Sequence, residues 1–145
     1  MTSSPSGDAL FAACKAEVAG LHRFFVGWMT GAVARDATTF ARFTDVVADG
    51  FALIGPGGTV SEREPLIAEL EAAHGGRPAF DIWIVDCRRR RTAGDLCLIT
   101  YEEWQRIGET KTGRLATALF RRHATAPNGV EWLHVHETWL PVAAP

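Results

Sequence analysis

The sequence predicts a single α+β domain in which helices come first and an antiparallel sheet follows. One long helical pattern opens the chain, four extended segments fill its second half, and strands do not alternate with helices as in a parallel sheet. A length of 145 residues, with 47% hydrophobic and 22% charged residues, is typical of one globular core. We therefore predict a flexible segment at residues 1–7, one domain over residues 8–141 and a tail at residues 142–145.

The net charge and the cysteine pattern argue against several classes of protein. A formal net charge of −2 gives no electrostatic reason to expect binding to nucleic acid or to an anionic membrane. The N-terminal residues show no basic segment followed by an apolar one, so a cytoplasmic protein is expected. Cys14, Cys87 and Cys97 are odd in number and lack C-x-x-C spacing, which favours reduced, mostly buried thiols. No metal site and no cofactor are predicted.

Residues 8–30 carry the pattern of one long amphipathic helix. Apolar residues recur there at steps of three or four and so share one broad face. They are Leu10, Cys14, Val18, Leu21, Phe25 and Trp28. Gly31 follows, where helices often end. His22 lies beside this stripe and either faces inward or lies on a flank; the flank is the simpler interpretation.

The sequence pattern in the middle of the chain predicts short helices and strands. A short helix is expected over residues 37–43, an extended segment over residues 46–54, and a turn at residues 55–58. Ser61 and Glu64 have the spacing of a capping box, which predicts that the next helix starts at Ser61.

Four extended segments complete the chain as a meander. They cover residues 80–90, 96–107, 112–123 and 131–141, with turn residues between them. The run Arg88-Arg89-Arg90-Arg91 is most simply the solvated end of the first segment, and a phosphate-bearing partner is the alternative.

The last segment has two different faces. Trp132, His134 and His136 alternate with Leu133, Val135 and Glu137, the period of two that a β-strand requires. One face is aromatic and imidazole, and the other is apolar with a single carboxylate. Neither resembles a plain solvent face, so we expect protein on both sides of this strand.

These segments carry a resemblance to a known superfamily. The run Tyr101-Glu102-Glu103-Trp104, residues 113–120 and the ending 132–141 resemble an uncharacterised branch of the nuclear transport factor 2-like superfamily, also called SnoaL-like or ketosteroid isomerase-like. The ending also resembles the last strand of the association domain of calmodulin-dependent kinase. The resemblance implies a curved sheet wrapped as a cone around the long helix, a cavity between them, and a homodimer through the outer face of the sheet. Members include isomerases, dehydratases, cyclases and hydrolases as well as binding and assembly domains.

The turns suggest a register for the last three strands. Counting outward from them places Ala116 opposite Glu137, Ala118 opposite Val135 and Phe120 opposite Leu133. The same counting places Glu103 opposite Ala116. The cavity residues predicted from this register and the helix stripe are Leu21, Phe25, Trp28, Ile99, Gln105, Ala116, Ala118, Phe120, Leu133, Val135 and Trp139.

Polar residues converge on one part of that face. Glu103 or Glu137 is the candidate general base, and Tyr101 or Arg114 is the candidate donor to a developing oxyanion. The alternative is an ion-pair network of Glu103, Arg114 and Glu137 that closes the cavity mouth without catalysis. A carboxylate on an apolar wall must be paired or must have a raised pKa, and either condition marks a site.

The opposite face predicts a dimer interface. Its residues are Trp104, Thr117, Leu119, Trp132, His134 and His136. The two histidines and Glu102 could form a metal site, but no third ligand is fixed by spacing, so buried hydrogen-bonding histidines are favoured.

Three functions remain open from the sequence. The domain binds a small, partly apolar molecule; or it is a cofactor-independent isomerase, cyclase or dehydratase that uses a Glu base; or it is a dimeric assembly module with an incidental cavity. A homodimer and a small-molecule ligand are the expected partners.

Overall fold

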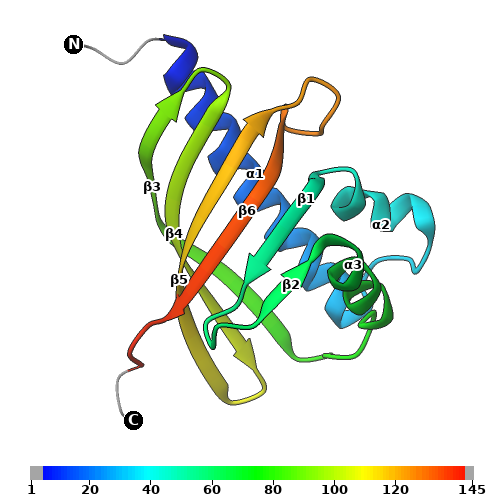
Figure 1. Ribbon diagram of the computed structural model, residues 1–145. Helices are drawn as coiled ribbons and strands as arrows, with labels where there is room; N and C mark the ends of the chain where they lie inside the picture. Colours follow the sequence, from blue (N-terminus) through cyan, green and yellow to red (C-terminus); the bar gives the residue numbers. More distant parts are fainter. Residues whose placement is uncertain (1–4, 143–145) are drawn as a thin grey trace.

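The computed structural model describes residues 5–142 and confirms the α+β class. Within that range the elements are α1 (Pro5–Thr30), α2 (Ala37–Thr44), β1 (Val47–Ile54), β2 (Val60–Glu62), α3 (Arg63–Ala72), β3 (Phe80–Ala93), β4 (Leu96–Ile107), β5 (Thr110–Arg122) and β6 (Val130–Trp139). The strands form one sheet in the order β2-β1-β6-β5-β4-β3 (Figure 1). Neighbours run antiparallel except β1 and β6, which are parallel.

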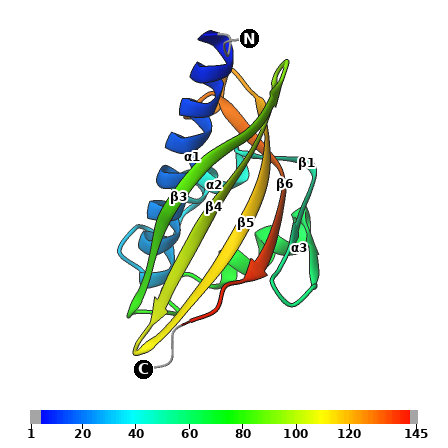
Figure 2. The same ribbon diagram turned by 90° about the vertical axis from the view of Figure 1, so that its left-hand side faces the viewer.

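Helix α1 lies along the concave side of this curved sheet (Figure 2). It begins at Pro5, three residues before the predicted start, and ends at Thr30. Gly31 follows with φ of 82°, the left-handed conformation that glycine adopts at helix ends. Most of residues 1–7 and 142–145 lie outside the described range, so the predicted flexible segment and tail stay predictions. No helix in residues 5–142 is long and apolar enough to cross a membrane.

A buried core lies between α1 and the sheet and extends to α2 and α3. Leu10, Cys14 and Val18 from α1 belong to the same buried cluster as Ile99 and Phe120 from the sheet. All five are at most 1% exposed. The three cysteines are free, as predicted, with two buried and one half-buried. Burial raises the pKa of the Cys14 thiol, which keeps it protonated.

Helix α3 begins later than the capping-box pattern predicts. Ser61 lies in β2, and Glu62 is the N-cap residue, with no capping bond from its side chain. Arg63 instead donates hydrogen bonds to the carbonyl oxygens of Val47 (3.0 Å) and Thr44 (3.1 Å). The capping-box prediction is therefore wrong. A side chain that ties α3 to β1 and the end of α2 has outweighed a local signal.

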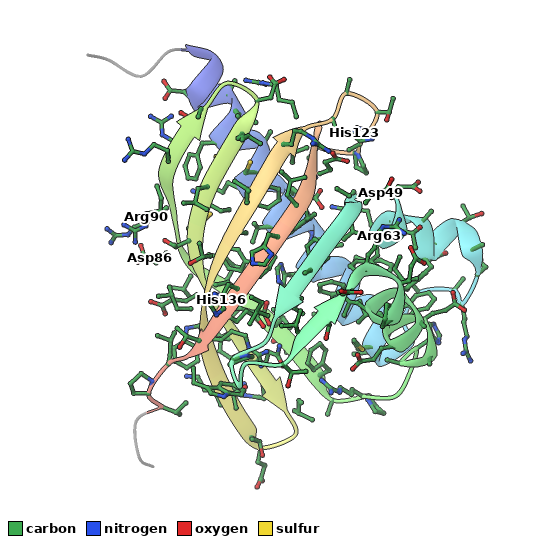
Figure 3. All side chains as sticks on the ribbon, in the orientation of Figure 1. Asp49, Arg63, Asp86, Arg90, His123 and His136 are labelled. Carbon is green, nitrogen blue, oxygen red and sulfur yellow. The ribbon has the colours of Figure 1, made fainter. Side chains whose placement is uncertain are left out.

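The arginine run lies on a bent, exposed part of β3. Two register shifts interrupt the pairing of β3 with β4, and Asp86 adopts a φ of 57° at the first. Asp86 and Arg90 both point away from the sheet (Figure 3). Arg88 pairs with Asp86 at 2.7 Å, and Arg89 pairs with Asp8 at 2.9 Å. These local partners agree with the solvated-strand interpretation.

The predicted register is right for β5 and the end of β6, and shifted elsewhere. Ala116 does lie opposite Glu137, and Ala118 opposite Val135. Between β4 and β5 the pairing is Glu103 with Arg114, two residues away from the prediction, because Ile107 pairs with Thr110 across a tighter turn. A shift of two leaves every side chain on its predicted face.

A bulge in β6 changes the face of one residue. Leu119 pairs with His134, but Phe120 pairs with Trp132, so Leu133 is the extra residue. Trp132 therefore lies on the inner face and is 3% exposed. Its predicted position on the outer face is wrong, and so is the inner position of Leu133. A bulge of this kind leaves no signal in the alternation of the sequence.

Candidate functional site

A cavity opens between α1 and the sheet, and several of its lining residues, such as Leu21, Phe43 and Leu66, also belong to the buried core. Its volume is about 180 Å³. The apolar walls come from the second half of α1, from α2 and α3, and from the sheet. The lining residues are Leu21, His22, Phe25, Met29, Phe43, Val47, Phe51, Leu53, Leu66, Leu70, Arg77, Phe80, Ile82, Tyr101, Glu103, Gln105, Arg114, Trp132, Val135 and Glu137.

All four predicted catalytic residues line this cavity, together with part of the predicted wall. Leu21, Phe25, Gln105 and Val135 line it as expected. The predicted residues that do not line it are Trp28, Ile99, Ala116, Ala118, Phe120, Leu133 and Trp139.

Those exceptions have physical reasons. Ala116 and Ala118 are fully buried members of the filled core, so their small size does not create the cavity. Trp28 lies beneath α3 and donates from Nε1 to the Leu70 carbonyl at 2.7 Å. Trp139 stands at the end of β6 and is 53% exposed.

Glu103 and His22 form a hydrogen-bonded pair in the cavity wall. Glu103 is 6% exposed, and its Oε1 lies 2.8 Å from His22 Nε2. Its other oxygen, Oε2, accepts from Gln105 Nε2 at 2.6 Å. His22 Nδ1 lies 2.6 Å from the Val18 carbonyl oxygen, which only accepts hydrogen bonds, so Nδ1 carries a proton. The proton between His22 and Glu103 is the one that can move.

The electrostatics of this pair favour imidazolium and carboxylate. Burial alone lowers the pKa of His22, but the charge and hydrogen bond of Glu103 reverse this and raise it above its ordinary value. Burial likewise raises the pKa of Glu103, but His22, Gln105 and Arg114 lower it further than burial raises it. The two groups therefore hold each other in the charged forms.

Glu137 is less completely paired than Glu103. It is 7% exposed, and Arg114 Nη1 lies 3.4 Å from its Oε1, a long hydrogen bond. Burial, and then the negative charge of Glu103, raise the pKa of Glu137 from 4.5 to about 7, although Arg114 opposes the change. The carboxyl of Glu137 is therefore a mixture of acid and carboxylate near neutral pH.

Arg114 is also incompletely paired. Its Nε lies 3.7 Å from Glu103 Oε2, beyond hydrogen-bonding distance. Within the described residues, this Nε is the one buried side-chain nitrogen or oxygen without a hydrogen-bond partner. The guanidinium carbon lies 4.9 Å from the centre of the Trp139 ring, so the aromatic face covers the cation.

Tyr101 completes the polar part of the wall as a neutral phenol. It is 1% exposed, and its ring meets the His22 ring edge-on at 5.7 Å. Burial, and then the charges of Glu103 and Glu137, raise its pKa well above the ordinary value. Tyr101 is thus a hydrogen-bond donor on a wall that also holds a proton acceptor.

His22 lines the cavity, so of its two predicted positions the inward one is correct and the favoured flank position is wrong. His22 follows Val18 by four residues and precedes Phe25 by three, so it shares the helix face that points inward. It is 5% exposed. Contributions from α2 and α3, such as Phe43 and Leu66, had no comparable signal because they depend on how those helices fold back over the cone.

The rest of the predicted outer face does lie outside the cone. Trp104 covers Gly113, where an added Cβ would lie 2.4 Å from the Trp104 ring. Lys111 Nζ sits 4.9 Å from the centre of that ring. Thr117, Leu119 and His134 are half-buried, and His136 is exposed. In residues 5–142, no group of three or more His, Cys, Asp or Glu side chains is placed to hold a metal ion.

Comparison with known proteins shows the family to which the sequence belongs. The sequence model of the sucrose-6-phosphate phosphohydrolase C-terminal family matches residues 15–141. Sucrose-phosphatase 1 from Nicotiana tabacum is 27% identical over 131 residues, which cover 88% of this chain and 31% of that protein. The chain thus spans about a third of the length of its curated relatives.

Solved structures confirm the predicted fold. An NTF-2-like protein of unknown function from Pseudomonas aeruginosa aligns with a TM-score of 0.80 and 22% identity, covering 89% of this chain and 99% of that one. The CaMKII hub of S. rosetta aligns at 0.65 and 11% identity, covering 97% and 100%. The fold is therefore NTF2-like, and by its family model the chain belongs to the sucrose-6-phosphate phosphohydrolase C-terminal family.

Proposed function

We propose that this domain binds a small, mostly apolar molecule in the cavity, with the polar head of that molecule at Glu137 and Arg114. The observation that carries the proposal is an open apolar cavity whose wall holds two buried groups that the protein leaves incompletely hydrogen-bonded. Buried polar groups are otherwise nearly always satisfied, because an unsatisfied one costs about 1–3 kcal/mol. A ligand would supply the missing partner.

The volume supports a ligand of about one ring. An apolar cavity of about 150 Å³ accommodates benzene, and this one measures about 180 Å³. Sucrose phosphate is larger and polar over nearly its whole surface. The cavity therefore suits a smaller and more apolar molecule than the substrate in the name of the curated relatives.

Cavity-filling substitution tests this proposal. Val135→Trp places a large ring in the cavity, and Val60→Trp makes the same change at a site that is 58% exposed. Ligand-observed NMR with a set of one-ring fragments measures binding. We expect hits for the wild type and for Val60→Trp, and loss of those hits for Val135→Trp. Hits that persist in Val135→Trp would place the binding elsewhere.

A second candidate function is proton-transfer catalysis of the isomerase or dehydratase type. It is favoured by the pKa of about 7 for Glu137, which lets this carboxyl accept and return a proton near neutral pH. In that reaction the Glu137 carboxylate removes a proton from an acidic C–H, while Tyr101 and Arg114 donate hydrogen bonds to the oxyanion. Glu137→Gln would then lower kcat by about 100-fold or more, whereas in a pure binding domain the same substitution changes affinity alone.

The third part of the proposal is a homodimer through the outer face of the sheet. Support comes from the half-buried Trp104, Leu119 and His134 on this face and from its likeness in fold to a hub domain. Leu119→Glu adds a charge there, and light scattering after gel filtration measures the mass. We expect a wild-type dimer and a monomeric variant, and a wild-type monomer at micromolar concentration would contradict the proposal.

A further inference from the structure

Arg114 has hydrogen-bonding capacity that no group in the cavity wall uses. Its guanidinium carries five N–H donors in one plane. Nε has no hydrogen-bond partner, and the Nη1 contact to Glu137 is long at 3.4 Å. The side chain is 15% exposed, so water reaches little of it. Trp139 lies over the face of the guanidinium, which leaves its N–H edge for an acceptor in the plane.

The two neighbouring carboxylates form only long ion pairs with this cation, 3.7 Å from Glu103 Oε2 to Nε and 3.4 Å from Glu137 Oε1 to Nη1. Both oxygens of Glu103 are already engaged, one by His22 at 2.8 Å and the other by Gln105 at 2.6 Å. Glu137 remains, and near neutral pH it carries its charge only part of the time. Arg114 therefore keeps N–H donor capacity for a further acceptor in the cavity.

Arg77 adds another cationic group at the mouth of the cavity. It lines the cavity while exposed to solvent, and its guanidinium carbon lies 5.4 Å from the centre of the Phe80 ring. Within residues 5–142 it forms no ion pair. The wall thus carries the cationic groups of His22, Arg77 and Arg114 against the carboxyls of Glu103 and Glu137.

We propose that the ligand is a small apolar monocarboxylic acid, whose carboxylate accepts hydrogen bonds from Arg114 while its hydrocarbon part lies against the apolar walls. This inference rests on the proposed binding function and adds the charge of the ligand. A carboxylate matches the planar donor edge of a guanidinium better than a neutral acceptor does, because its two oxygens can accept parallel N–H bonds and its charge is opposite to that of Arg114. The volume limits the hydrocarbon part to about one ring, as in benzoate.

Glu137 can also bind a carboxylate ligand when its own carboxyl group is protonated. In the acid form its O–H donates to the second oxygen of a bound carboxylate, whereas its carboxylate form repels the ligand. Binding is therefore coupled to proton uptake, about half a proton per ligand at pH 7 for a group that titrates there. The charged and titratable groups that face Glu137 in the cavity are His22 from α1, Tyr101 and Glu103 from β4, Arg114 from β5 and Arg77 at the mouth.

The test compares benzoate with its neutral isostere benzamide by isothermal titration calorimetry at pH 7. We expect benzoate to bind the wild type about tenfold more tightly than benzamide does, the scale of one charge-assisted hydrogen bond. Arg114→Gln should remove this preference. Arg90→Gln deletes the same charge at an exposed site outside the cavity and should keep it. Arg77→Gln, at the exposed mouth, should reduce the preference about threefold without a risk to folding.

Protonation is measured in the same experiment by repeating it in phosphate and in Tris, which differ in ionisation enthalpy. The inference predicts proton uptake for benzoate in the wild type and none in Glu137→Gln. Equal affinity for benzoate and benzamide would overturn the acid ligand and leave the proposed binding function intact. Binding of neither compound would also overturn it, and the fragment experiment on Val135→Trp then decides whether the cavity binds anything.

Discussion

Glu17 and Glu137 are both buried carboxyl groups at the inner side of the cone, but the protein treats them in opposite ways. Glu17 is 0% exposed and accepts four hydrogen bonds between 2.8 and 3.0 Å, two from Arg42 and one each from Asn128 and Trp132. Glu137 is 7% exposed, and the hydrogen bond described for it is the 3.4 Å contact with Arg114.

We propose that this difference separates a structural carboxylate, Glu17, from a ligand-binding one, Glu137. The partners of Glu17 come from α2, β6 and the turn before β6, so this network joins α1 to the rest of the fold and leaves no acceptor free. Glu137 and Arg114 face a cavity and keep capacity for another molecule. A network with all hydrogen bonds made stabilises the fold, whereas one with donors left over beside a cavity is what we expect of a binding site.

The largest predicted effect is a loss of stability when Glu17, whose hydrogen bonds are all made, is replaced. Glu17→Ala leaves Arg42 and the indole N–H of Trp132 without their acceptor, and we expect a loss of about 3–5 kcal/mol in the free energy of unfolding. Urea denaturation measures it. Glu64→Ala, at a side chain that is 76% exposed, serves as the matched control and should change stability by less than about 0.5 kcal/mol. A loss below about 1 kcal/mol for Glu17→Ala would remove its structural role.

The next largest effect is the pH dependence of the free energy of unfolding that the titration of Glu137 causes. Its pKa is higher in the folded protein (about 7) than the ordinary 4.5, so the folded state binds more protons between these values. Stability therefore falls as pH rises from about 4.5 through 7, by about 3 kcal/mol in total. Glu137→Gln lacks this dependence.

Urea denaturation of both proteins at pH 4.5 and pH 8 checks this sign. The variant should gain about 3 kcal/mol relative to the wild type between the two pH values. Parallel curves for the two proteins would show that Glu137 titrates normally in the folded state.

The smallest effect is the influence of Glu103 on its neighbour. Glu103→Gln removes a negative charge that raises the pKa of Glu137, so that pKa should fall, by roughly one unit. The loss of charge on His22, which follows from losing its partner, limits the fall. A carboxyl ¹³C titration of the variant measures it, and a rise would contradict the proposed coupling.

The fold was largely accessible from the sequence because helix and strand periods are local signals. The stripe from Leu10 to Trp28 predicts α1, and the alternation in residues 96–123 predicts β4 and β5. The four candidate catalytic residues do line the cavity, since a register error of two residues leaves each side chain on the same face of the sheet. Trp132 was placed on the wrong face because one bulge inverts the alternation, and nothing local in the sequence encodes that bulge.

The walls of the cavity were harder to predict than its polar groups. Ala116 and Ala118 suggest room, but the room at their positions is filled by the core, and the cavity lies where Phe43 and Leu66 arrive from α2 and α3. Whether a gap between elements is filled depends on long-range packing, which periodicity does not report. His22 is the instructive exception, because its place on the helix face was already visible in the spacing.

The comparison between the two carboxyl groups depends most directly on the protonation of Glu137. A carboxyl ¹³C NMR titration of the wild-type protein, with Glu137→Gln used to assign the resonance, measures its pKa in the folded state. We expect a midpoint at about 7. A midpoint near the ordinary 4.5 would show that Glu137 is as well stabilised as a solvated carboxylate and would contradict the proposal that the cavity is a binding site.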